Sequence, residues 1–311
     1  SKINGHTFQL FTKTRCDADN FLATLSNIRS QTICLGECAS FTECTGVNYE
    51  EKSSTCELIS SNEMTCSFSA NTYWSHAHLN CNYQYNRDCQ TLHENDCWQN
   101  GVYEIEPDSS QSTFDVYCDM QDGGWTVIQR RYDGSVEFHN QNWTEYKDGF
   151  GDVSAEHWLG NDLIHLITNS ANYEIKFDLM TPDNVWHYAT YSNFSIQDEA
   201  ANYQLSIGPF KSGTVEDVIV NNTKANKRLN GMKFTTRDRD NDLQELESCA
   251  RTDSHNGGGW WYNYCTGVCP NCKYSMDGIY HGLDFGIKWQ TLTFAGGPSL
   301  MATTMKLKRL T

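Results

Sequence analysis

The 311-residue sequence lacks several features that would assign it to a common class of protein. It contains no run of eighteen apolar residues, so we expect no membrane-spanning helix. Neither a Gly-x-Ser-x-Gly, a His-Glu-x-x-His, a Walker loop nor a dinucleotide-binding fingerprint occurs, so we expect no enzyme. No heptad, internal repeat or Gly-X-Y tract is present either, so neither a coiled coil nor a collagen stem would assemble the protein.

Basic residues are also scarce, with 23 Lys and Arg against 39 Asp and Glu and a net charge of -16. This charge repels nucleic acid and acidic lipid surfaces, so we expect neither as a partner. Residues 1–81 carry 5 basic and 8 acidic side chains, which leaves 18 basic and 31 acidic side chains in residues 82–311. The negative charge therefore lies mainly downstream, where it favours cations or cationic groups as partners.

Cysteine, by contrast, is abundant. Fourteen cysteines, an even number, predict a disulfide-bonded extracellular protein. Three Asn-x-Ser/Thr sequons, at Asn142, Asn193 and Asn221, agree with a secreted glycoprotein, although such tripeptides also arise by chance. The sequence opens at Ser1 with no basic and apolar leader, so we expect a mature, secreted form.

Cysteine density divides the sequence, because seven cysteines fall in residues 1–81 and seven in the remaining 230. Two domains of different fold are therefore predicted. In the first, residues 30–39 predict a short helix with Ser30 as N-cap, which places Cys34 and Cys38 one turn apart on one face. Residues 7–11, 46–49 and 72–74 are typical of strands.

The order of cysteines in residues 1–81 resembles that of the PAN or apple module, a sheet with one helix stapled to it. The resemblance implies three disulfides, namely Cys34 with Cys56, Cys38 with Cys44, and Cys16 with Cys81 or, as second choice, Cys66. It also allows a protein partner for this module. Residues 82–88 form a short polar connector, and residues 89–311 the second domain.

Residues 89–311 resemble the fibrinogen C-terminal domain, whose family includes fibrinogen chains, ficolins and horseshoe-crab tachylectins. The matching segments follow one another in order, from Cys89 through 101–103 (GVY), 114–120 (FDVYCDM), 123–131 (GGWTVIQRR), 133–136 (DGSV), Trp143, Tyr146, 149–151 (GFG) and 158–162 (WLGND) to 286–289 (GIKW) and 305–307 (MKL). The resemblance implies an antiparallel sheet, short helices and a loop-rich subdomain for calcium and ligand, so the protein is α+β. It also implies that Cys89 pairs with Cys118 and Cys249 with Cys265.

Within this domain, apolar alternation predicts strands at residues 102–105, 114–118, 125–130 and 173–179, and helical periodicity near residues 156–168.

Three alternating carboxylates, Asp238, Asp240 and Asp242, are the strongest sign of a metal site. Crowded carboxylates repel unless they share a cation, and hard oxygen ligands suit Ca²⁺. The family resemblance implies side-chain ligands Asp240 and Asp242 and main-chain carbonyls at Gln244 and Leu246. One extra residue before the following cysteine could move the carbonyls by one. For Asp238 we expect a solvated turn carboxylate.

An EF-hand is excluded for the same stretch. Counted from Asp238, the sixth position is Leu243 rather than Gly, and the twelfth is Cys249 rather than Glu.

A ligand pocket beside the second disulfide, with a cis peptide between Tyr264 and Cys265, is implied by the same resemblance. The contact residues that we expect are His255, Tyr264, Cys265, Thr266, Tyr280 and Asp284, and Trp260 and Trp261 are assigned to the core. Thr266 stands where lectin members often have histidine, and Asp284 aligns with the fibrinogen carboxylate that meets a ligand amine. Acetylated groups, amines or a mixed ligand therefore stay open.

The segment after the pocket inserts two more cysteines, Cys269 and Cys272, which we expect to pair locally. The alternative is a Zn²⁺ site of Cys265, Cys269 and Cys272 with His281, since the spacing is compatible. We expect this inserted loop to share the recognition surface.

Local pairing in the insert leaves one cysteine over in each domain, Cys66 and Cys97. Either an interdomain or an intermolecular bridge would use both.

The leading functional hypothesis is a secreted, calcium-binding lectin of innate immune recognition that binds glycans or acetylated or amine-bearing ligands. Since single-site sugar binding is weak, this hypothesis predicts a homo-oligomer. The alternative is an extracellular structural or adhesive matrix protein with a structural calcium site and no acetyl-sugar specificity.

Overall fold

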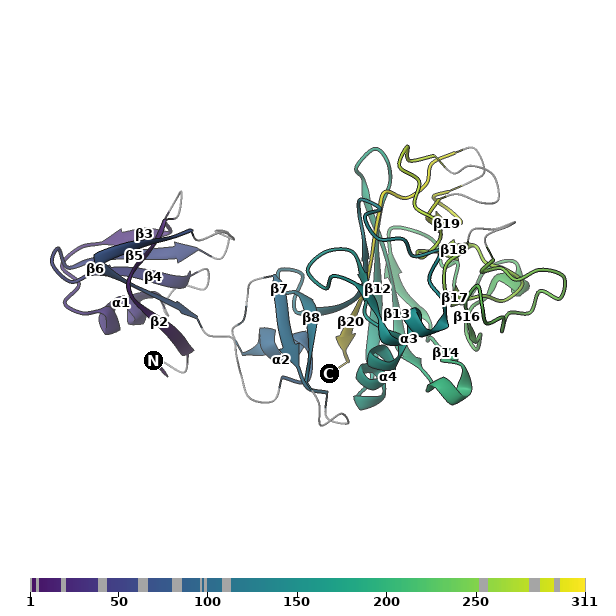
Figure 1. Ribbon diagram of the computed structural model, residues 1–311, viewed down its shortest axis with the longest axis horizontal. Coiled ribbons are helices and arrows are strands. Elements are labelled where there is room, and N and C mark those ends of the chain that lie inside the picture. The colour runs from purple at the N-terminus through teal and green to yellow at the C-terminus, as the bar shows by residue number, and fades with distance from the viewer. Residues whose placement is uncertain are drawn as a thin grey trace. The chain divides into compact units, whose positions relative to one another are not determined.

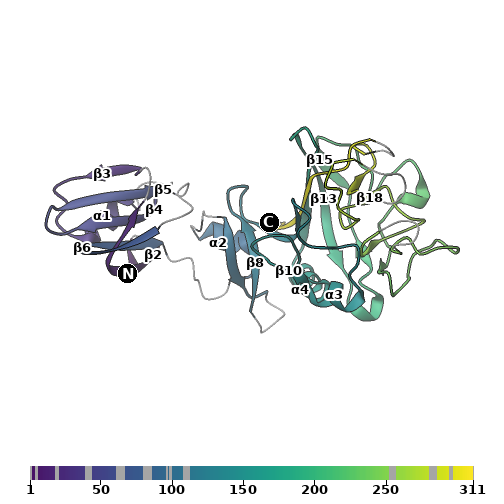
Figure 2. The same ribbon diagram turned by 45° about the horizontal axis from the view of Figure 1, so that its top comes forward.

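The computed structural model describes residues 2–3, 6–17, 21–38, 44–60, 67–79, 86–95, 97, 100–107, 113–251, 257–279, 286–293 and 297–310 (Figures 1 and 2). The protein forms two compact units, one of residues Ser1–Gly101 with Asp119–Gly124 and the other of Val102–Cys118 with Trp125–Thr311. Over the described ranges, no helix is long and apolar enough to cross a bilayer.

The first unit is built on an antiparallel sheet with strand order β1-β2-β6-β4-β5-β3. Its elements are β1 (Lys2–Ile3), β2 (His6–Asp17), β3 (Ala23–Leu25), α1 (Gln31–Cys38), β4 (Cys44–Glu50), β5 (Thr55–Ser60) and β6 (Ser67–Leu79). The predicted helix and its cap are confirmed, because the Ser30 hydroxyl accepts the amide hydrogen of Ile33 at 3.3 Å. One face of α1, with Cys34, Leu35 and Cys38, is buried.

Two disulfides fasten α1 to this sheet, Cys34 to Cys56 in β5 and Cys38 to Cys44 at the start of β4. They lie in a small core with Leu35, Val47 and Leu58, all of which are buried. So few apolar residues bury little surface, and the cross-links supply stability that the core cannot. The pairing of Cys16, Cys66 and Cys81 lies outside the described residues.

The first unit also contains the short helix α2 (Cys89–Glu94). Asp88 caps it, since its Oδ1 accepts the amide hydrogen of Thr91 at 2.8 Å. Gly124, at a φ of +79°, comes so close that a Cβ there would lie 2.6 Å from that of His93. Cys89 and Cys118 are each in a disulfide, and Cys97 is buried.

The second unit is built on an antiparallel sheet of order β10-β11-β9-β20-β12-β13-β14, with β15 on β13 and β7-β8 on β9. The strands are β7 (Gly101–Ile105), β8 (Phe114–Asp119), β9 (Trp125–Arg131), β10 (Phe150–Gly151), β11 (His157–Trp158), β12 (Tyr173–Met180), β13 (Trp186–Ile196), β14 (Leu205–Ser206), β15 (Phe210–Gly213) and β20 (Ala302–Arg309). The four predicted strands of this domain are confirmed.

Helices α3 (Trp143–Asp148) and α4 (Asn161–Ser170) lie side by side, and α4 contacts β13. The prediction of a helix from residue 156 was wrong at its start. Gly160 has a φ of +108°, which no α-helix allows, and β11 precedes it, so helical geometry begins only at Asn161.

The loop-rich part of this unit carries the candidate site. It contains η1 (Glu199–Ala201), η2 (Ala225–Lys227) and two small ladders, β16 (Phe234–Thr235) with β17 (Trp260–Trp261) and β18 (Val268–Cys269) with β19 (Lys288–Trp289). Figure 1 shows these ladders gathered to one side of the main sheet. Trp260 and Trp261 are buried, as predicted, and the Trp261 ring meets that of Phe234 edge to face at 5.1 Å.

Candidate calcium and recognition site

The aspartate loop follows β16 and is organised by the carboxylate of Asp242. Its Oδ1 accepts the amide hydrogen of Gln244 at 2.8 Å, and its Oδ2 accepts that of Cys249, also at 2.8 Å. The Asp240 carboxylate lies next to it and accepts the amide hydrogen of Asp242 at 3.3 Å. One side chain thus closes the whole loop up to the disulfide cysteine.

The surroundings of the Asp242 carboxylate disfavour its negative charge, which a bound cation would compensate. Burial raises the pKa of Asp242, and the neighbouring Asp240 carboxylate raises it further, against the two amide hydrogens that lower it. Across the described residues, no donor reaches the main-chain carbonyls of Gln244 or Leu246. Two carboxylates and open carbonyls are hard oxygen ligands, so the donor set fits Ca²⁺.

Asp238 differs from its prediction as a merely solvated turn carboxylate. Its side chain is exposed, but Oδ1 accepts the amide hydrogen of Trp143 at 2.9 Å and the hydroxyl hydrogen of Thr236 at 2.7 Å. A carboxylate at the first residue of α3 satisfies an amide that the helix leaves open. Asp238 therefore ties the loop to α3.

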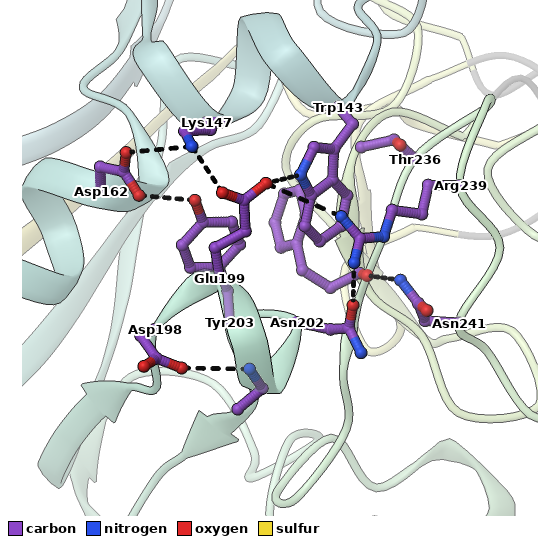
Figure 3. A network of polar contacts seen from close by, with 12 residues as sticks. Trp143, Lys147, Asp162, Asp198, Glu199, Asn202, Tyr203, Thr236, Arg239 and Asn241 are labelled. Atoms are coloured by element: carbon purple, nitrogen blue, oxygen red, sulfur yellow. Dashed lines mark hydrogen bonds and ion pairs between the residues drawn. The ribbon is translucent and has the colours of Figure 1, made fainter.

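Arg239 contacts Trp143 as well, as part of a polar network (Figure 3). The guanidinium lies 3.8 Å from the centroid of the Trp143 ring, and its Nη2 donates to Asn202 Oδ1 at 2.6 Å. Glu199 accepts from Trp143 Nε1 at 2.8 Å, pairs with Lys147 and lies 3.8 Å from Arg239 Nη1. The hydrogen bond from Lys147, and then that from Trp143, lowers the pKa of Glu199. Sequence reasoning missed this network, because its members come from separate segments.

We expect Arg239→Lys to lower the free energy of unfolding by about 1 kcal/mol, because lysine keeps the charge but loses the planar stack on Trp143. Urea unfolding followed by tryptophan fluorescence measures this change. Arg237→Lys is the control, since Arg237 is exposed and donates to Asn140. Equal losses in the two variants would contradict a specific role for the stacked guanidinium.

The segment around Tyr264 is joined directly to the aspartate loop. Cys249 is bonded to Cys265, and the amide hydrogen of Leu243 is accepted by the carbonyl of Asn263 at 2.9 Å. The Tyr264 side chain is 42% exposed. The aspartate loop is therefore joined, by a disulfide and a hydrogen bond, to the segment that carries an exposed aromatic residue.

The expected cis peptide between Tyr264 and Cys265 was wrong, since this bond is trans. Cys265 adopts a φ of +49°, in the left-handed region that residues other than glycine rarely occupy.

The other contact candidates divide into two groups. Thr266 is only 4% exposed and its hydroxyl accepts the amide hydrogen of Val268 at 3.0 Å, so its side chain presents almost no surface to a ligand. His255, Tyr280 and Asp284 lie outside the described residues.

The insert Cys269–Cys272 is part of the interior, which corrects its expected place on the recognition surface. The two cysteines are bonded to each other, and Asn271 between them is fully buried. The buried guanidinium of Arg131 donates to the carbonyl of Pro270 at 3.0 Å. The insert therefore fills space against β9.

The zinc alternative is also wrong. Cys265 is bonded to Cys249, and Cys269 to Cys272, so all three proposed thiolate ligands are in disulfides. Its fourth ligand, His281, lies outside the described residues.

All three sequon asparagines are exposed, as an attached glycan would require. Asn193 has a φ of +52°, and the Nδ2 of Asn221 donates to Asp217 Oδ2 at 2.9 Å. That hydrogen bond uses the nitrogen that a glycan would modify.

Comparison with known proteins matches residues 85–310 to the family described as fibrinogen beta and gamma chains, C-terminal globular domain. Fibrinogen-like protein 1 of Bos taurus is 41% identical over 212 residues, which are 66% of this chain and 66% of that protein. Ryncolin-4 of Cerberus rynchops is 39% identical over 213 residues, 68% of this chain and 54% of that protein. The chain thus spans between about half and about two thirds of the length of these relatives.

Two solved structures have a similar fold. The fibrinogen-like globe domain of human ANGPTL2 gives a TM-score of 0.64 at 33% identity, covering 72% of this chain and 99% of that one. Lamprey fibrin D-dimer, complexed with the peptide ligand Gly-His-Arg-Pro-amide, gives a TM-score of 0.66 at 34% identity. The match covers 74% of this chain and 76% of that one.

Proposed function

Because residues 85–310 place this protein in the family of C-terminal globular domains of the fibrinogen beta and gamma chains, we propose that it is an extracellular, calcium-binding recognition protein of lectin type. Domains of this family are binding or structural proteins rather than enzymes. The observation that carries the proposal is the direct bonding of the aspartate loop to the segment of exposed Tyr264. Disulfides such as Cys34–Cys56, Cys38–Cys44, Cys249–Cys265 and Cys269–Cys272 suit an oxidising compartment.

The calcium ligands in this proposal are the carboxylates of Asp240 and Asp242 and the carbonyls of Gln244 and Leu246. The cation supplies positive charge to two carboxylates that otherwise repel each other. The protein positions these ligands itself, because the Asp242 carboxylate holds the loop closed by its hydrogen bond to Cys249. The disulfide of Cys249 with Cys265 links the loop to the ligand segment.

The ligand class in this proposal is glycans or acetylated groups. An exposed aromatic ring such as Tyr264 suits the methyl of an acetyl group. The lamprey protein was solved with a peptide, and an amine-bearing ligand was the other expectation for this protein. The ammonium of Lys227, 2.6 Å from the Tyr264 carbonyl oxygen, repels such an amine, which favours the acetylated class.

The N-terminal part of the proposal is a PAN/apple-like module in residues 1–81, with a connector at 82–88 and the fibrinogen domain at 89–311. In support, α1 is stapled to a sheet by two disulfides. We assign to this module a protein partner or the contacts of a homo-oligomer, which would supply multivalency to a lectin of innate immune recognition. Light scattering and nonreducing gels test this part, and a strict monomer contradicts it.

A glycan and acetylated-compound binding screen, run with and without chelator, tests the function. We expect binding in calcium, a loss of at least about tenfold with chelator, and a similar loss in Asp240→Asn and Asp242→Asn, because an amide is a weaker calcium ligand than a carboxylate. Binding to nothing, or binding indifferent to chelator and to both substitutions, would favour the structural matrix protein instead.

A further inference from the structure

Two turns that are far apart in the sequence expose large apolar side chains at one end of the main sheet of the second unit. In the turn from β12 to β13, Val185 is 45% exposed and Trp186 is 55% exposed. In the turn of residues 275–279, Met276 is 76% exposed and Ile279 is 42% exposed. Apolar side chains of this size are normally covered when they gather in one place.

Contacts at Gly278 place the two turns side by side. A Cβ at Gly278 would lie 3.2 Å from Pro182 Cγ and 3.0 Å from Met301 Sδ. The Met301 amide donates to the carbonyl of Met180 at 2.8 Å, and Met180 is the register partner of Trp186. The exposed apolar residues of the two turns therefore form one surface, the apolar tip, which consists of Pro182, Val185, Trp186, Met276 and Ile279.

Backbone hydrogen bonds hold both turns of the apolar tip in place. The amide of Thr181 donates to the carbonyl of Val185 at 3.1 Å, and the amide of Ser299 donates to the carbonyl of Gly278 at 2.9 Å. Ile279 also forms an antiparallel bridge with Pro298. A surface that is already ordered in the free protein costs little conformational entropy when a partner binds.

Two exposed carboxylates flank the apolar tip, one from each turn. Asp183 lies next to Pro182, and a hydrogen bond with the Thr181 side chain lowers its pKa. Asp277 lies next to Met276, and its Oδ1 accepts the amide hydrogen of Ile279 at 3.0 Å. The tip therefore presents apolar side chains between two fixed negative charges.

This charge pattern selects among the partners that an apolar surface could have. A second copy docked through the same surface would bring its own two carboxylates against these two, and like charges at an interface disfavour it. An anionic lipid surface is repelled in the same way. A partner with cations beside its apolar face is complementary, and Met180, Met276 and Met301 give the surface flexible thioethers that adapt to such a face.

We propose that the apolar tip is a docking surface for a basic amphipathic peptide segment of a partner protein. The apolar face of that segment covers Trp186 and Met276, and its lysine or arginine side chains pair with Asp183 and Asp277. This proposal goes beyond the lectin function, because no residue of the tip is an assigned calcium ligand or an expected sugar contact.

The test is a fluorescence anisotropy titration of the full-length protein with three labelled peptides. The first is an amphipathic helix of leucine and lysine, about four turns long. The second replaces each lysine by glutamate, and the third has the composition of the first in an order that leaves no apolar face. We expect the first peptide to bind at least about tenfold tighter than either of the others.

Substitutions in the apolar tip separate the apolar contribution from the charged one. Trp186→Ser should weaken binding of the basic peptide at least about tenfold, and Met276→Gln about fivefold. Asp183→Asn should weaken it about threefold and reduce its dependence on salt. The matched controls are Ile33→Gln, at an exposed apolar position of α1, and Glu216→Gln, which removes an exposed charge elsewhere. Both controls should bind as the parent does.

Several results would overturn the proposal. Equal binding of the lysine and glutamate peptides would remove the charge complementarity, and undiminished binding in both Trp186→Ser and Met276→Gln would place the peptide elsewhere. Binding of none of the three peptides would also contradict it. A dimer in sedimentation velocity that Trp186→Ser dissociates would assign the surface to a second copy, and binding to phosphatidylcholine vesicles that Trp186→Ser abolishes would assign it to a membrane.

Discussion

Removing calcium is expected to lower the melting temperature of the fibrinogen domain by roughly 10 °C, and Asp242→Asn is expected to abolish that dependence. A ligand present at a thousand times its dissociation constant stabilises the folded state by about 4 kcal/mol, which for a domain of this size is roughly 10 °C. Asp242 is the residue to change, because its two oxygens close the loop from Gln244 to Cys249 and its carboxylate is half-buried beside that of Asp240.

Differential scanning calorimetry with calcium and with excess chelator measures this shift. Asp238→Asn is the matched control, because it removes the same charge four residues earlier in the sequence. The Asp238 side chain accepts hydrogen bonds from Trp143 and Thr236 and is not an assigned calcium ligand. The control should melt lower than the parent in both buffers and keep its full calcium shift. An undiminished calcium shift in Asp242→Asn would refute the assigned ligands.

Much of the fold follows from local patterns that the sequence displays directly. Alternating apolar residues predict β9 and β12, and the Ser30 cap with cysteines four apart predicts α1. Such patterns work because side-chain periodicity matches backbone geometry over a few residues. The burial of Trp260 and Trp261 follows from their size and apolarity.

The parts that sequence reasoning could not predict depend on contacts between distant segments. The hydrogen bond of Asp238 to Trp143 spans 95 residues, so the same carboxylate reads locally as a solvated turn. The insert after Val268 is expected at the recognition surface, yet Arg131 of β9 donates to the Pro270 carbonyl and Asn271 is fully buried. Backbone detail fails similarly, because the left-handed φ of Cys265 replaces the expected cis bond.

Glu156→Gln is expected to lower the free energy of unfolding by about 3 to 5 kcal/mol, the largest loss of stability among the substitutions predicted for the second unit. Glu156 is fully buried. Its Oε1 accepts the amide hydrogens of Tyr132, Asp133 and Gly134 at 2.7, 2.9 and 2.9 Å, and its Oε2 accepts that of Val136 at 2.9 Å. One carboxylate therefore shapes the entire turn after β9.

Glutamine is nearly isosteric with glutamate, but its NH₂ group would replace one of the two accepting oxygens. At least one backbone amide hydrogen of the turn would then face a donor and lose its acceptor. The substitution also removes the negative charge that acts on buried Arg131. Burial lowers the pKa of Arg131 to about 10, and the Glu156 carboxylate opposes this effect by raising that pKa. Two buried groups would lose their compensation at once, which is why the expected cost exceeds that of one hydrogen bond.

Urea unfolding of Glu156→Gln beside Glu216→Gln, an exposed position with the same chemical change, isolates the burial effect. The control should stay within about 0.5 kcal/mol of the parent. Because Arg131 also holds the buried Cys269–Cys272 insert, Glu156→Gln should loosen that insert as well, measurable as faster reduction of the Cys269–Cys272 disulfide. A stability loss below about 1 kcal/mol would mean that the turn keeps its shape without this carboxylate.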